Sequence, residues 1–102
     1  MRKEFVKDLK VKDETYCVFD DGTTYIFEVE EIYEHPNTRT IVFGLRSNGN
    51  TYTFDCGIYS SWICGEIGGA PIVIYFNKED AIEALKYTIK KCNDSINMIE
   101  NI

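Results

Sequence analysis

The sequence predicts an α+β fold, in which a strongly bent antiparallel sheet or small, partly open β-barrel of five to six strands precedes one long C-terminal helix. Aromatic and β-branched residues alternate in short runs, Asp-Gly and Asn-Gly turns separate these runs, and the apolar period changes after Asn77. A chain of 102 residues has room for one core. We therefore expect a single domain over residues 1–102, with the sheet at about 3–76 and the helix at about 78–99.

The first four strands are predicted as two hairpins. Asp-Asp-Gly at residues 20–22 separates "ETYCVF" from "TTYIFEV", and Ser-Asn-Gly-Asn at 47–50 separates "TIVFGL" from "TYTFDC". Both turns contain residues that accept positive φ cheaply. In the second run the buried parity of Phe27 and Val29 is lost at Ile32. We expect a β-bulge near Glu30 and Glu31 that restores the parity and bends the sheet.

The last strand and the helix are predicted from "APIVIYFNKEDAIEAL". Gly68 and Gly69 allow a turn before a run that is apolar on both faces, which indicates a central, covered strand. Asn77 is expected to cap the helix, with Asp80 reaching back in a variant of the capping box. Steps of three and four then place one apolar stripe along the helix, formed by Ile82, Leu85, Ile89, Cys92, Ile96 and Ile99.

The order "VKDETYCVF", "EVEEIY" and "PIVIYFNKEDAIEALK" resembles a large group of small uncharacterised proteins encoded by bacteriophages and mobile elements of Gram-positive bacteria. Those proteins have a Gly-Asp-x-Val-Tyr strand, a Val-x-x-Ile strand and a "VFLTREEAEKAL"-like strand and helix. Lys12 stands in place of the Gly, and Asn77 in place of the capping Thr. The resemblance covers about residues 10–87. It implies a small barrel with a C-terminal helix, no assigned catalytic residue, and a phage or mobile-element accessory protein, a class that includes inhibitors of host defence.

The charge balance disfavours direct binding of DNA or RNA. Seventeen acidic residues outnumber eleven basic ones and give a net charge of -6, whereas nucleic-acid affinity comes largely from clustered Lys and Arg. A basic or nucleic-acid-binding host protein is a more compatible partner. The sequence contains neither a signal-peptide run nor an apolar run long enough for a bilayer, so we expect a cytoplasmic protein with no membrane contact.

An acidic cluster on the second strand is the first candidate binding surface. It consists of Glu28, Glu30, Glu31 and Glu34. Three uses are open: a solvated face that protects a sheet edge, a cation or acid-base site together with Asp20 and Asp21, and a row of carboxylates that imitates phosphates. We assign the cluster to partner binding.

The four cysteines, at positions 17, 56, 64 and 92, lack the paired spacing of a zinc site. We predict no metal, no cofactor and no catalytic residue. A nucleophile made by Cys56 or Cys64 with the single histidine, His35, stays open because sequence distance does not report spatial distance.

Two further surfaces are candidates for protein contacts. Tyr59 and Trp62 are large aromatics among small residues, as in partner anchors, although Trp62 could instead cap the core. The helix is longer than the strands it would cover, so its second half is expected to extend beyond the sheet and to form a homodimer through Cys92, Ile96, Met98 and Ile99.

These features together predict a non-enzymatic protein-interaction module. We expect a phage or mobile-element accessory protein, comparable with anti-CRISPR proteins, that binds and inhibits a host nucleic-acid-binding or defence protein. The alternatives are a small metal- or ligand-binding enzyme and a structural subunit that assembles through its helix.

Overall fold

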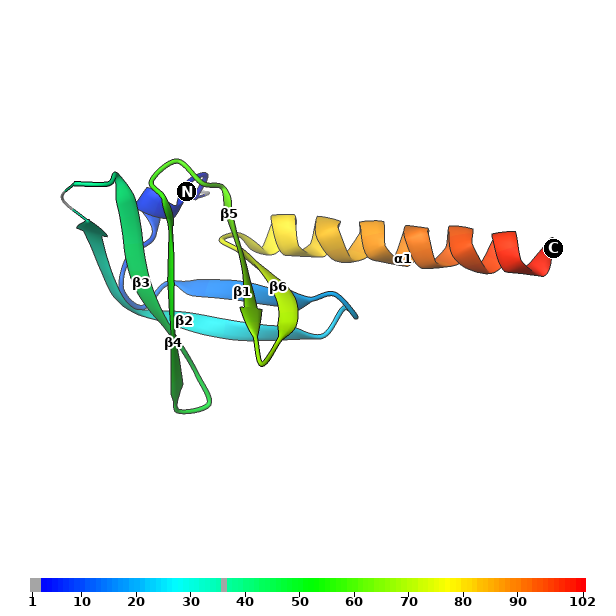
Figure 1. Cartoon of the computed structure of the whole chain (residues 1–102), viewed down its shortest axis with the longest axis horizontal. Helices are drawn as coiled ribbons and strands as arrows, with labels where there is room; N and C mark the ends of the chain where they lie inside the picture. The colour runs from blue at the N-terminus through cyan, green and yellow to red at the C-terminus, as the bar shows by residue number, and fades with distance from the viewer. Residues whose placement is uncertain (1–2, 36) are drawn as a thin grey trace.

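The computed structural model describes residues 3–35 and 37–102 (Figure 1). One antiparallel sheet of six strands, in the order β4-β3-β2-β1-β6-β5, curls into a nearly closed barrel. A short 3₁₀ helix precedes the sheet and one long helix, α1, follows it (Figure 1). The elements are the 3₁₀ helix Val6–Asp8, β1 Glu14–Phe19, β2 Thr24–His35, β3 Thr40–Ser47, β4 Asn50–Gly57, β5 Trp62–Ile67, β6 Ala70–Tyr75 and α1 Lys78–Glu100. The predicted fold class is confirmed.

The predicted bulge is present in β2. The register runs from Val29 opposite Leu45 to Glu31 opposite Gly44, so Glu30 is the extra residue. Thr24 to Glu28 pair with β1, whereas Glu28 to His35 pair with β3. The strand therefore changes partner at its bend, and it has neighbours on both sides only around Glu28 and Val29. The sequence also predicts a turn at residues 35–37, of which Pro36 lies outside the described residues.

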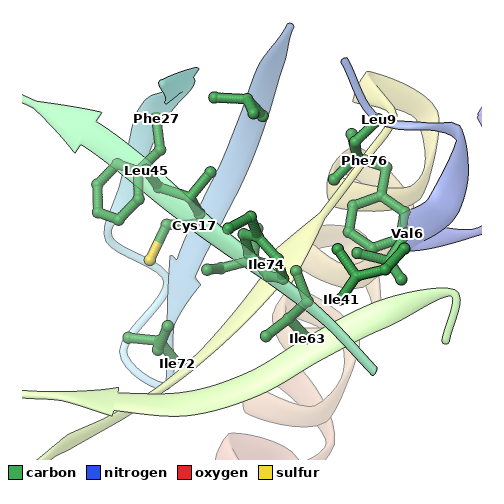
Figure 2. Close-up of a cluster of buried hydrophobic side chains, with 12 residues drawn as sticks. Val6, Leu9, Cys17, Phe27, Ile41, Leu45, Ile63, Ile72, Ile74 and Phe76 are labelled. Carbon is green, nitrogen blue, oxygen red and sulfur yellow. The ribbon is translucent and has the colours of Figure 1, made fainter. Parts of the chain in front are cut away.

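The core is made by the strands and the 3₁₀ helix. Phe43, Leu45 and Ile74 are fully buried, and Val6 and Phe76 pack at one end of the same cluster (Figure 2). The barrel closes where β4 meets β5, because the Phe54 ring covers Gly65. Since these side chains already fill the interior, α1 has only the outside of the sheet to pack against.

The helix covers less of the sheet than the sequence predicts. Ala81 is its one buried residue, and all of α1 is described. Leu85 is half-buried, but Ile82 and Ile89 are 50% and 59% exposed. From residue 91 onward every side chain is exposed, and the helix projects from the barrel (Figure 1). The first half of the helix lies against β1 and β6, as expected, but it does so through Ala81 and Leu85, and the stripe residues Ile82 and Ile89 stay exposed.

Asn77 begins the helix in a different way from the predicted capping box. Its side chain makes no cap hydrogen bond to the helix. Its Oδ1 instead accepts a hydrogen bond from the Lys3 backbone N–H at 3.0 Å, and its Nδ2 donates to the Lys3 carbonyl and to Asp80 Oδ2, the latter at 3.1 Å. Asn77 thereby ties the start of α1 to the N-terminal segment.

Lys12 adopts a backbone conformation that favours glycine, with φ of 77°. The turn is held in place because the Lys12 N–H donates to the Val29 carbonyl at 2.7 Å. The Gly of the resembling proteins falls at this position. We predict that Lys12→Gly raises the unfolding free energy by about 0.5–1 kcal/mol, since it removes the steric cost of positive φ.

Chemical denaturation measures this effect, with Lys10→Gly as the matched control. Lys10 has no positive φ, so glycine there should only increase the entropy of the unfolded chain and lower stability. Equal effects at the two positions would contradict the prediction.

Closure of the barrel depends on the absence of a side chain at Gly65. A Cβ there would lie 3.1 Å from Phe54 Cε1, closer than ordinary contact. We predict that Gly65→Val costs about 1–3 kcal/mol by forcing β4 and β5 apart. Gly57→Ala is the control, because its added Cβ would meet only Ser60 Oγ at 3.7 Å. If the denaturation midpoint fell equally for both variants, the close approach of Phe54 to Gly65 would not be the cause of the destabilisation.

Candidate functional site

The outer face of the sheet carries a row of apolar side chains across four strands. Trp62 pairs with Tyr75, Tyr75 with Tyr16, and Tyr16 with Ile26, so all four lie on one face. Trp62 and Ile26 at the two ends are 56% and 55% exposed. Val18 and Val73 form the next cross-strand pair on this face. An apolar outer face of this kind is unusual for a solvated strand surface and is typical of a contact surface.

A groove of about 870 Å³ lies where the first turns of α1 run beside this face. Val18 and Val73 line it from the sheet, and Ala84 and Tyr87 line it from the helix. Trp62 and Phe5 belong to the same lining. The groove exists because α1 contacts the sheet through small residues such as Ala81, which leave the larger aromatic side chains uncovered on either side.

The ionisable groups of the groove are acidic. Glu4, Asp20, Asp80 and Glu83 line it, and no Lys or Arg does so among residues 3–35 and 37–102. Burial raises the pKa of Tyr75, and the neighbouring Cys64 and Asp80 raise it further. The Tyr75 phenol is therefore neutral at physiological pH and adds a polar group without charge.

The acidic cluster predicted on β2 does not form one row. Glu28 has Arg46 as its cross-strand partner, and Glu30, at the bulge, accepts a 2.7 Å hydrogen bond from Thr51 Oγ1. Glu31 pairs with Gly44 on the outer face, whereas Glu34 pairs with Ile41 on the other face. The bulge and the alternation of the strand thus separate the four carboxylates. All four are exposed.

The predicted aromatic anchors occupy two different environments. The segment around them was expected to be a surface loop, but Trp62 begins β5 and lines the groove, while Ile63 takes the core position beside it. Tyr59 lies outside the groove lining. Its ring packs edge-on against Phe5, and Lys7 Nζ lies 4.7 Å from its centre. Tyr59 is 56% exposed but already has a cation on its face.

The exposed end of the helix carries the residues predicted for dimerisation. Ile96, Met98 and Ile99 are 51%, 64% and 65% exposed, and Cys92 is exposed. They project beyond the sheet, as expected for a helix longer than the strands.

The cysteines and the histidine are not assembled. Cys56 pairs with Ile41 and packs against the core, while His35 is exposed and pairs with Thr40, on the opposite face of the sheet. Cys64 is exposed on β5, where it pairs with Val73 on the outer face. No three His, Cys, Asp or Glu side chains in the described part of the chain are placed to hold a metal ion.

The groove was missed by sequence reasoning, although one signal for it existed. The run "APIVIYF" is apolar on both faces, which predicts that both faces of the strand are covered. The structure buries Ile72 and Ile74 inside the barrel but leaves Val73 and Tyr75 half-buried under a helix that covers them in part.

No helix among the described residues combines the length and apolarity that crossing a membrane would require.

Comparison of the chain with protein-family models, with curated proteins and with solved structures gave no match.

The thiols should differ strongly in reactivity. Burial raises the pKa of Cys17 to about 11, and burial also raises the pKa of Cys56, whereas Cys64 and Cys92 are exposed. Because the thiolate is the reactive form, we predict that a disulfide reagent at pH 8 modifies Cys64 and Cys92 rapidly and Cys17 only when the protein unfolds. Peptide mass mapping over time measures the order. Rapid labelling of Cys17 in the folded protein would contradict it.

Proposed function

We propose that this chain is a non-enzymatic protein-interaction module that forms a homodimer through the projecting part of α1 and uses its barrel to bind a basic partner protein. One observation carries the proposal. A stripe of isoleucines is 50–65% exposed along a helix whose side chains are all exposed from residue 91 onward. Most helical stability in proteins comes from packing of an apolar face, so covering the stripe would stabilise the helix itself.

The spacing of the stripe favours another helix as its cover. Ile82, Ile89 and Ile96 recur every seven residues, and Leu85, Cys92 and Ile99 recur between them. This is the heptad pattern of a coiled coil, with β-branched residues at the first position of each heptad, a choice that suits two-stranded assemblies.

The charges of the helix favour a second copy of the chain as that partner. The whole chain carries a net charge of -6, which opposes self-association over most of its surface. The projecting half of α1 differs, because from residue 90 onward it has two lysines, Lys90 and Lys91, against two acids, Asp94 and Glu100. Two copies can therefore approach along this half without the repulsion expected elsewhere.

Ile96→Glu should dissociate the dimer, because pairing would bury a charge in the apolar contact. We expect a wild-type mass of twice 11.8 kDa in sedimentation equilibrium at micromolar concentration, and the single-chain mass for the variant. The dissociation constant should rise by at least about a hundredfold, equivalent to about 3 kcal/mol. Helical circular dichroism should fall with it.

Met98→Glu is the matched control. The sequence-based prediction included Met98 in the pairing surface, but the heptad stripe proposed here runs through Ile96 and Ile99 and leaves Met98 about 200° round the helix from Ile96. Met98→Glu introduces the same charge two residues away on a comparably exposed side chain. Loss of the dimer in both variants, or in Met98→Glu alone, would place the contact elsewhere. A monomeric wild-type protein would refute the pairing.

The biological setting is proposed from charge and resemblance. The net charge of -6 and the similarity to phage and mobile-element proteins support an accessory protein that inhibits a host nucleic-acid-binding or defence protein, as anti-CRISPR proteins do. A non-enzymatic role is supported by the separation of His35 from Cys56 on opposite faces of the sheet. The gene neighbourhood tests the setting, since a location outside phage or defence genes would argue against it.

A further inference from the structure

The groove beside α1 combines an apolar floor with a rim of one charge sign. Val18 and Val73 form the floor, and Glu4, Asp20, Asp80 and Glu83 surround it. None of its described lining residues is Lys or Arg. An occupant must therefore bring apolar surface for the floor and positive charge for the rim, because an acidic ligand would meet repulsion from every side.

The walls of the groove add a second preference for cations. Trp62 and Tyr87 line it and are 56% and 64% exposed. The faces of Trp and Tyr rings attract Lys and Arg, Trp most strongly. Lys91 Nζ already lies 5.7 Å from the Tyr87 ring centre, so a partner's cation would compete with Lys91 there, whereas the Trp62 ring has no such contact among the described residues.

We propose that this groove binds an amphipathic, lysine- or arginine-bearing segment of a partner protein. Apolar side chains of the segment cover Val18 and Val73, and its cations lie between the rim carboxylates and the rings of Trp62 and Tyr87. The volume of about 870 Å³ is at the upper end of the range for enclosed ligand sites and suits side chains from one face of a peptide helix. The inference rests on the proposed interaction role but not on the pairing of α1.

Trp62 makes the proposal directly measurable, because it is the only Trp in the chain. The probe is a helix-forming peptide of leucine and lysine, about 18 residues or five turns long and free of aromatic residues. We expect a saturable blue shift of Trp62 emission as the peptide covers the ring. Glu83→Lys should weaken binding by at least about tenfold, because it reverses a rim charge.

Asp55→Lys is the matched control, since it makes the same charge change at an exposed residue of β4 that does not line the groove. It should leave the affinity within about twofold of wild type, because screening limits its reach. Equal weakening by the two variants would assign binding to general acidity and overturn the groove. The groove would also be refuted if Trp62 emission showed no blue shift. A peptide with glutamate in place of lysine that bound equally well would refute it too.

Two further measurements test whether the site is the groove. The first separates it from the pairing of α1, and the second from a purely charged patch. Ile96→Glu should bind the peptide with unchanged affinity per chain, and loss of binding in that variant would place the site on the helix pair. Oligolysine without leucine should bind at least about tenfold more weakly, because it leaves the floor uncovered. Binding as tight as that of the amphipathic peptide would reduce the site to a charged patch and refute it.

Discussion

β2 pairs with β1 through its first half and with β3 through its second, and the bulge at Glu30 turns the strand between these two partners. A bulge increases the local twist and bends the strand that carries it. The two ends of the sheet are thereby brought round until β4 meets β5, where the bare backbone of Gly65 accepts the ring of Phe54. Without the bend, the inner faces of the two halves would not enclose one core, and Phe43, Leu45 and Ile74 would lack a shared interior.

Closure of the barrel decides what the helix can do. An open sheet needs a helix on its apolar face, but this barrel buries its inner side chains among the strands and the 3₁₀ helix (Figure 2). α1 is therefore left on the outside, held by Ala81, by Leu85 and by the Asn77 contact with Lys3. So small a contact explains both the projecting half of the helix and the groove beside its first turns.

Local patterns predicted most of the elements, because strand and helix periods are set by neighbouring residues. The alternation of Phe27 and Val29, its slip before Ile32 and the glycines at the turns led to the bulge and the hairpins that the structure has. Strand β5 was missed as a strand, since its sequence "WICGEI" alternates weakly and its pairing with β6 is fixed by closure of the barrel. The stripe on α1 was also visible, but periodicity does not say which side of a helix faces the sheet. That rotation is set by Ala81 and Asn77, whose contacts are tertiary.

The two proposed surfaces lie on different sides of α1, and this placement has a functional consequence. Ile89, in the stripe, is about 200° round the helix from Tyr87, in the groove. A second helix can therefore cover the stripe while the groove stays open, and a dimer would present two acidic, aromatic grooves on one assembly. A partner that carries two basic segments, or that is itself dimeric, would then bind with an effective concentration set by the spacing of the barrels. Under that geometry a modest affinity at each groove suffices for tight binding of the whole partner. Dimerisation would therefore strengthen partner binding without contributing a single residue to the groove.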